Sequence, residues 1–154
     1  MKNIAVFPGS FDPFTVGHKS IVDRALNMFD EIIIAIGYNS EKSGFFPIEK
    51  RVEWINKIFE RQSEISVITY QGLTVEFCRE NNANYILRGL RTSEDFEYER
   101  AIAQMNKKLL PDTETVFLLT SPEHTPISSS IVREIYKHGG DVSEFIPEGI
   151  VLGK

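Results

Sequence analysis

The sequence is poor in the features that mark extracellular, redox-active or membrane-spanning proteins. Only one of its 154 residues, Cys78, is a cysteine, so an internal disulfide is excluded and a reducing compartment is favoured. The longest stretch without Asp, Glu, Lys or Arg runs only from Ile65 to Val75, whereas a membrane-spanning helix needs about 20 apolar residues. Pro8 ends the first apolar run too early for a secretory signal. We therefore expect a cytoplasmic protein without a membrane anchor.

Basic residues are in the minority, and this limits the expected partners. The chain has 17 Lys and Arg against 22 Asp and Glu, which gives a net charge of −5. A surface of this sign repels nucleic acids and anionic lipids at long range, so we expect neither as a partner. Hydrophobic residues make up 42% of the chain, enough for a folded core, and the length predicts one domain, 1–154.

Short apolar runs alternate with helical patterns along the whole chain. Five runs are typical of strands, at 4–7, 32–36, 66–70, 85–87 and 116–119. Apolar spacing and Ser or Thr caps predict helices around 21–29, 48–59, 75–78, 94–110 and 129–138. Because parallel strands need crossover connections, usually helical, the pattern predicts an α/β fold: a doubly wound five-stranded parallel sheet with helices on both faces.

Polar and basic side chains follow several of these strands. Ligands of open α/β sheets bind at the carboxyl ends of the strands, where four segments meet: 9–18, the loop with Lys42, 88–91 and 127–130. We expect Arg88 to leave the sheet directly after the strand at 85–87. Cations and hydroxyls that converge in an acidic protein predict a pocket for a small polyanion, such as a phosphate compound.

The first of these segments has the features of a phosphate-binding turn. Gly9 and Gly17 leave room beside the backbone, and His18 lies at the opening of a helix, whose free N–H groups attract phosphate. The helix dipole opposes protonation of His18 while bound phosphate favours it, so His18 is either a neutral donor or a cation. Glycine-rich signatures of dinucleotide dehydrogenases and P-loop kinases are missing, and the three histidines lack metal-ligand spacing.

Three motifs together carry a family resemblance: Gly-Ser-Phe-Asp-Pro-Phe-Thr-Val-Gly-His at 9–18, Arg-Gly-Leu-Arg at 88–91 and Ile-Ser-Ser-Ser-Ile-Val-Arg-Glu at 127–134. Over nearly its whole length the chain resembles the bacterial phosphopantetheine adenylyltransferases. The first and last motifs look like those of the wider nucleotidyltransferase superfamily, while the middle motif, continued at 95–99 and 105–106, points to this family. The resemblance implies a Rossmann-like nucleotidyltransferase fold and transfer of the adenylyl group of ATP to 4′-phosphopantetheine, which gives dephospho-coenzyme A and pyrophosphate.

The resemblance also implies roles for individual residues. Ser10 and His18 bracket the α-phosphate, Lys42 and Arg88 hold the acceptor phosphate, and Arg91 joins these four in catalysis. Thr74 lies in the segment that faces the pantetheine arm. The ATP site is implied to comprise Ser10, Phe11, His18, Gly89, Leu90, Arg91, Glu99, His124, Ile127, Ser128, Ser129 and Ser130. The resemblance further implies that Mg²⁺ accompanies the nucleotide, that coenzyme A acts as a competing feedback ligand, and that the protein forms a homohexamer.

Other interpretations stay open on the residues alone. A related nucleotidyltransferase could use another acceptor, nicotinate or nicotinamide mononucleotide or an alcohol phosphate, and a non-catalytic module could bind adenylates without turnover. Glu99 is either a nucleotide contact or an exposed helix acid, and a loop lysine such as Lys42 is ordinarily solvated. The serines at 128–130 fit a helix cap as well as a phosphate site, since both use the same free N–H groups.

Overall fold

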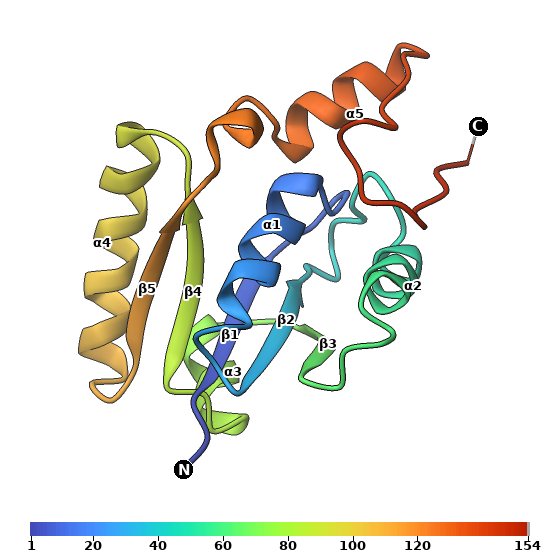
Figure 1. Ribbon diagram of the computed structural model, residues 1–154. Helices are drawn as coiled ribbons and strands as arrows, with labels where there is room; N and C mark the ends of the chain where they lie inside the picture. Colours follow the sequence, from blue (N-terminus) through green and yellow to red (C-terminus); the bar gives the residue numbers. More distant parts are fainter. Residues whose placement is uncertain (154) are drawn as a thin grey trace.

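A five-stranded parallel sheet forms the centre of the computed structural model, which describes residues 1–153 (Figure 1). The strands are β1 (Ile4–Gly9), β2 (Glu31–Gly37), β3 (Ile65–Tyr70), β4 (Tyr85–Leu90) and β5 (Glu114–Leu119). Their order in the sheet is β3-β2-β1-β4-β5, and every neighbouring pair is parallel. The predicted doubly wound sheet is therefore confirmed.

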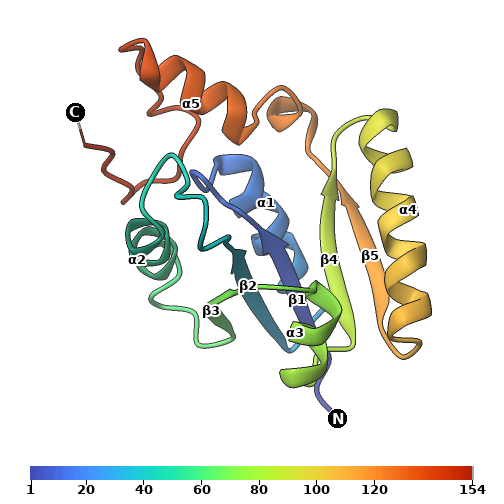
Figure 2. The ribbon, with the colours of Figure 1, turned by 180° about the vertical axis from the view of Figure 1, so that it is seen from behind.

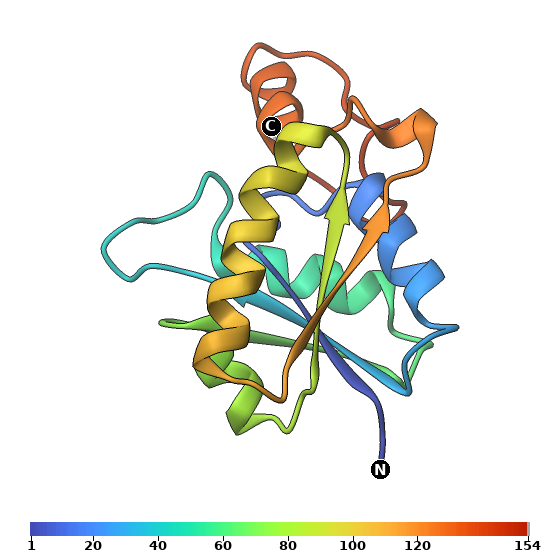
Figure 3. The ribbon, with the colours of Figure 1, turned by 90° about the vertical axis from the view of Figure 1, so that its left-hand side faces the viewer.

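Helices cover both faces of this sheet. They are α1 (Val16–Ala25), α2 (Ile48–Ile58), α3 (Thr74–Glu80), α4 (Ser93–Leu109) and α5 (Ser129–Lys137), with a 3₁₀ helix η1 (Pro122–His124) before α5. The helices α1 and α2 lie on one face, and α3 and α4 lie on the other, as Figure 2 shows from behind and Figure 3 from the side. Within residues 1–153, no helix is both long and apolar enough to cross a membrane.

The core follows from the alternation of side chains along β2. Ile32, Ile34 and Ile36 are fully buried toward α1 and α2, while Ile33 and Ala35 pack in the cluster that includes α3. A strand that is covered on both faces must be apolar at every position, which explains why this run shows no polar alternation.

Side-chain caps fix where three of the helices begin. The hydroxyls of Thr15, Thr92 and Ser128 accept backbone N–H groups at the first turns of α1, α4 and α5. Each cap satisfies a donor that has no partner within the helix. Because two of the capped turns, those of α1 and α5, belong to the segments expected to bind phosphate, capping also sets the direction of the chain at the site.

All five strands are longer than the apolar runs predicted, and the extension of β4 changes the position of Arg88. The strand β4 continues through Arg88 to Leu90, paired with β5 from Arg88↔Phe117 to Leu90↔Leu119. The expectation that Arg88 leaves the sheet after residue 87 is wrong, because the backbone pairing with β5 extends past the last fully buried residue, Leu87.

The strand order reverses between β1 and β4, which are neighbours in the sheet although β2 and β3 lie between them in sequence. At such a reversal the two crossover helices diverge to opposite faces and leave a crevice at the carboxyl ends of the strands. The helix α5 lies across that end of the sheet (Figure 1). The fold thus opens a site between the loop after β1, the end of β4 and the start of α5.

Removing the side chain of Leu87 should lower the free energy of unfolding by about 2–5 kcal/mol, because Leu87 is fully buried between the sheet and its helices. The matched control is Leu73→Ala, at a leucine that is 59% exposed, which should cost less than about 0.5 kcal/mol. Urea unfolding of both variants measures the difference. Equal losses in the two variants would contradict this core.

Candidate active site

Two cavities adjoin at the reversal of strand order. The first has a volume of about 370 Å³ and lies between the loop after β1, the start of α4 and the start of α5. The second has a volume of about 350 Å³ and lies between the ends of β1 and β2, the start of α3 and one side of α4. Pro8, Gly9, Ser10, Arg88 and Glu99 line both cavities and form their common wall. Each cavity is of the size that holds a small-molecule ligand.

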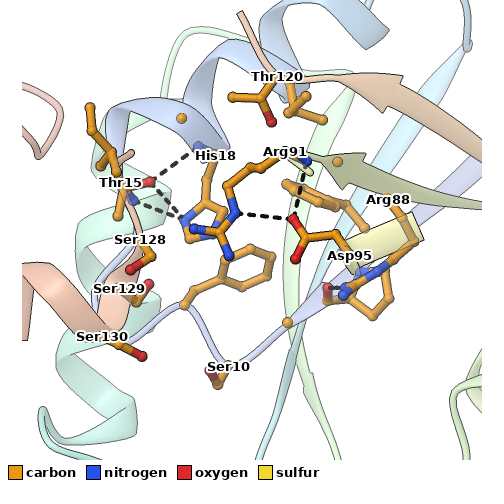
Figure 4. A pocket seen from close by; sticks show the side chains of 18 of the residues that line it. Ser10, Thr15, His18, Arg88, Arg91, Asp95, Thr120, Ser128, Ser129 and Ser130 are labelled. Atoms are coloured by element: carbon orange, nitrogen blue, oxygen red, sulfur yellow. Dashed lines mark hydrogen bonds and ion pairs between the residues drawn. The ribbon is translucent and has the colours of Figure 1, made fainter. Parts of the chain in front are cut away.

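His18 lines the first cavity and is held by the cap of its own helix (Figure 4). The backbone N–H of Thr15 donates to Nδ1 of His18 over 3.0 Å, and the N–H of His18 donates to the Thr15 hydroxyl over 3.3 Å. Because Nδ1 accepts a hydrogen bond, the hydrogen of the neutral ring lies on Nε2. The histidine therefore offers one N–H donor that the cap does not use.

The surroundings of His18 keep its ring neutral. The rings of Phe11 and Phe14 lie 5.0 and 5.3 Å from it, centre to centre. This burial lowers the pKa of His18 from 6.5 to about 3, and the positive charges of Arg88 and Arg91 add to the effect. Of the two forms left open by the sequence, the ligand-free protein holds the neutral donor.

Arg88 is fixed in the common wall by Glu99 and by the end of β1. Its Nε and Nη2 donate to the Glu99 carboxylate over 2.9 and 2.5 Å, and its Nη1 donates to the Pro8 carbonyl over 2.6 Å. A guanidinium has five N–H donors, so about two remain for a ligand. Glu99 is only 9% exposed. It is therefore not the exposed helix acid that one interpretation allowed, because its carboxylate is turned inward onto Arg88.

Arg91 and Asp95 lie side by side at the rim of the first cavity (Figure 4). The Asp95 carboxylate accepts from Nε of Arg91 over 3.3 Å and from its backbone N–H over 3.1 Å. Asp95 in turn donates its N–H to Thr92, the cap of α4. The pair is partly exposed, so a ligand can compete for Arg91.

The start of α5 forms the opposite wall, where Figure 4 shows three serines in a row. Ser128 caps the helix, Ser129 donates its hydroxyl to the Pro13 carbonyl over 2.8 Å, and Ser130 accepts from Arg133 over 3.3 Å. The first backbone N–H groups of the helix have no acceptor within it, which suits an anion. Capping and anion binding are thus compatible here. The serine hydroxyls cap and anchor the helix, and the backbone N–H groups that they do not use can bind an anion.

Arg133 is a site residue that the sequence reasoning did not single out. It lines the first cavity and donates to the backbone carbonyl of Asp12 over 2.8 Å. Within residues 1–153 it forms no ion pair with a carboxylate, unlike Arg88 and Arg91. The sequence feature that could have indicated Arg133 is its position four residues after Ser129, which puts both side chains on the same side of α5. Asp95 and Thr120 also line this cavity and were not predicted.

Most of the predicted site residues line the two cavities. The first cavity is lined by Phe11, His18, Gly89, Arg91, Ile127 and the three serines at 128–130. Ser10, Arg88 and Glu99 line both cavities, and Thr74 lines the second. The hydroxyl of Thr74 lies 2.9 Å from that of Tyr70 at the end of β3. Segments that are far apart in sequence therefore do meet at one edge of the sheet.

Three predicted residues line neither cavity. Lys42 is exposed on the loop between β2 and α2, where its backbone N–H donates to Asn39. Leu90 is buried at the end of β4. His124 lies against Gly17, and its Nδ1 is buried without a hydrogen-bond partner. Their proposed contacts with substrate stay predictions.

The residues at the site do not form a metal centre of their own. Asp95 and Glu99 are the carboxylates that line the first cavity, and each is paired with an arginine. No group of three His, Cys, Asp or Glu side chains within residues 1–153 is placed to hold a metal ion. The arrangement instead presents arginines, backbone N–H groups and a neutral imidazole, which together suit the oxygens of phosphates.

The lowered pKa of His18 should be visible by NMR. We expect the ring signals of His18 to keep the neutral form from pH 8 down to about pH 4, because its pKa is about 3 in the native protein. In the chain unfolded by urea, the same signals should titrate near pH 6.5. The unfolded chain thus binds the proton first, so stability should fall as the pH drops from about 6.5 toward 3. A native titration near pH 6.5 would contradict the burial of this ring.

Comparison with known proteins places this chain in a family. The model of the cytidylyltransferase-like family matches residues 6–135. A phosphopantetheine adenylyltransferase of Leptospira biflexa is 52% identical, and the match covers 96% of this chain and 92% of that protein. One of Bacteroides thetaiotaomicron is 51% identical, with 96% and 97% covered.

Solved structures show the same fold at much lower identity. A putative nicotinate-nucleotide adenylyltransferase of Vibrio parahaemolyticus superimposes with a TM-score of 0.71 at 20% identity, over 97% of this chain and 96% of that one. A bifunctional NMN adenylyltransferase/ADP ribose pyrophosphatase of Francisella tularensis gives 0.71 at 17% identity, over 95% of this chain and 45% of that one. About half of the aligned residues are identical to those of the two phosphopantetheine adenylyltransferases, whereas a fifth or fewer are identical to those of the two solved structures. The chain therefore belongs to the phosphopantetheine adenylyltransferase family of cytidylyltransferase-like proteins.

Proposed function

We propose that the protein transfers the adenylyl group of ATP to 4′-phosphopantetheine, which gives dephospho-coenzyme A and pyrophosphate, a step of coenzyme A biosynthesis. The observation that carries this proposal is the pair of adjoining cavities, whose common wall is built from Ser10, Arg88 and Glu99. Two phosphate compounds bound on the two sides of that wall would place their phosphates next to each other. Relatives about half identical to this chain are named phosphopantetheine adenylyltransferase, which supports the choice of substrates.

The reaction is a direct displacement at the α-phosphorus of ATP. An oxygen of the acceptor phosphate forms the new bond to this phosphorus, the bond to the bridging β-phosphate oxygen breaks, and pyrophosphate leaves with the electron pair. A phosphomonoester has a second pKa of about 6 and is largely a dianion at neutral pH, so the nucleophile needs no general base. Catalysis then consists of placing two anions in line and stabilising the charge that grows between them.

His18 supplies a fixed donor for this growing charge. Because Nδ1 accepts from Thr15, the ring hydrogen lies on Nε2, which the cap leaves available to a substrate. The aromatic rings around the imidazole hold its plane. A preorganised donor of this kind contributes about 10²–10³ in rate. Because the ring is neutral, it can donate this hydrogen bond without first gaining or losing a proton.

The two cavities suit the two substrates in different ways. The first offers Arg91, Arg133 and the start of α5 to a triphosphate, and Arg133 has only neutral oxygens as partners in the described part of the chain. The second is lined by Tyr98, Ile102 and Ala103 of α4, beside the hydroxyl of Thr74 and the amide of Asn106. A mixture of apolar surface and hydrogen-bonding groups fits the pantetheine arm, with Arg88 at its phosphate end.

Mg²⁺ is proposed as part of the nucleotide substrate. The carboxylates that line the first cavity, Asp95 and Glu99, are engaged by arginines, which favours an ion that arrives with the nucleotide. Bound to ATP, Mg²⁺ would neutralise part of the charge on the phosphate oxygens.

The wider expectations for the family are also proposals. Exposed apolar side chains on α4, among them Tyr98, Met105 and Leu109, support contacts between subunits. That the assembly is a hexamer is the expectation from the family, which light scattering can measure. Coenzyme A contains both the pantetheine arm and the adenylate, so we propose that it competes with the substrates; its inhibition pattern in the assay below tests this. A cytoplasmic location remains part of the same proposal.

The function is tested by a pyrophosphate-release assay. Purified protein with ATP and Mg²⁺ should release pyrophosphate when 4′-phosphopantetheine is added. The comparison panel replaces phosphopantetheine with nicotinate mononucleotide, nicotinamide mononucleotide or a small alcohol phosphate. The alcohol phosphate is tested with CTP as well as with ATP. Turnover with one of these in place of phosphopantetheine would identify another acceptor. ATP binding without turnover on any of them, by folded protein, would support a non-catalytic module instead.

A further inference from the structure

The loop between β2 and α2 carries the one proposed catalytic residue that lies outside both cavities. This segment, residues 38–46, is here called the Lys42 loop, and Figure 3 shows it standing away from the sheet. Its tip is exposed, and Lys42 forms no ion pair in the part of the chain that the structure describes. The position of Lys42 relative to the site therefore depends on the contacts that hold the ends of the loop.

The carboxylate of Asp12 holds the carboxyl end of the Lys42 loop. Asp12 follows Ser10 in the loop after β1, and it is only 7% exposed. Its two oxygens accept the backbone N–H groups of Phe45 and Phe46 over 2.7 and 2.8 Å. Hydrogen bonds from N–H groups to a buried carboxylate are stronger than those to neutral acceptors. The bonds join the segment that carries Ser10 directly to the segment that carries Lys42.

Arg51, on α2, holds the same two segments from the other side. It is 4% exposed, and its Nη1 donates to the carbonyl of Ser10 over 2.7 Å. Its Nε donates to the carbonyl of Phe46 over 3.0 Å and lies 3.9 Å from the Asp12 carboxylate. All these partners are backbone atoms of the two segments or the Asp12 carboxylate, so the pair fixes main-chain positions and does not merely fill space.

Gly44 is the residue that allows the Lys42 loop to approach this pair. A Cβ at position 44 would lie 2.7 Å from Nη2 of Arg51 and 2.7 Å from Oδ2 of Asp12. Both groups are buried and already hydrogen-bonded, so they cannot move aside as the end of a flexible surface chain would. A side chain at this position therefore forces a shift between the Lys42 loop and the Asp12–Arg51 pair.

We propose that Asp12, Arg51 and Gly44 form a clamp of positioning residues, which sets the Lys42 loop relative to Ser10 and thereby presents Lys42 to the acceptor phosphate. This inference rests on the proposed function. The clamp acts through main-chain atoms and touches no substrate. The carbonyl of Asp12 accepts from Arg133 of α5, a backbone contact that is separate from the carboxylate bonds that hold the Lys42 loop.

A double-mutant cycle between Gly44 and Lys42 tests the clamp. Gly44→Ala alone should raise the KM for 4′-phosphopantetheine about tenfold, the size expected for coupled neighbours, and change ATP binding less than about twofold. In the Lys42→Ala background the same substitution should change that KM less than about twofold, because the group that the clamp presents is gone. Gly153→Ala is the control, since a Cβ there meets nothing within 4 Å.

The outcomes separate the clamp from the function itself. If the unaltered protein releases no pyrophosphate, the proposed function fails. If it is active but Gly44→Ala acts equally with and without Lys42, or weakens ATP and acceptor alike, the clamp is wrong. Should Gly44→Ala fail to fold, Asp12→Asn replaces it: its amide nitrogen cannot accept an N–H, so one of the two loop bonds is lost, and the same dependence on Lys42 is expected.

Discussion

The contact of Arg88 with Glu99 and Pro8 is the interaction on which the site depends. It joins three elements at the point where strand order reverses: the end of β1, the strand β4 and the helix α4. Because the guanidinium is held on two sides, it can be neither withdrawn into solvent nor turned away from the cavities. It stands in their common wall with about two donors unused, which is the position from which one cation can contact both an acceptor phosphate and a nucleotide.

The chemical state of His18 follows from the same arrangement. Burial among aromatic rings lowers its pKa, and the nearby charges of Arg88 and Arg91 lower it further. The arginines thus supply the positive charge at the site while the histidine supplies a neutral, oriented donor held by Thr15. In the proposed reaction between two anions, the fixed cations would offset repulsion on binding, and the neutral donor would stabilise the charge that develops only during transfer.

The sequence predicted the fold and the meeting of distant segments because both depend on local patterns. Runs such as 32–36 are apolar at every position only in a strand covered on both faces, and polar segments after parallel strands share one edge. It could not predict the partners of long side chains. Arg88 lies in a strand because β5 pairs beyond the apolar run, and Glu99 is buried because that arginine faces it. The contacts of Arg133 and Arg51 with the loop after β1 likewise join residues about 40 to 120 positions apart. Spacing along α5 puts Arg133 on the same side as Ser129, but it does not reveal these distant partners.

We propose that a neutral His18 stabilises the transition state at the wall fixed by Arg88, and the rest of the mechanism depends on this role. The most direct measurement is the kinetics of His18→Ala alongside its affinity for ATP, with His138→Ala, at an exposed histidine, as the matched control. We expect kcat to fall by about 10²–10³ while ATP affinity changes little, because the hydrogen bond strengthens only as charge develops. If ATP affinity and kcat/KM fell by the same factor with kcat unchanged, His18 would serve ground-state binding alone, which would contradict its role in the transition state.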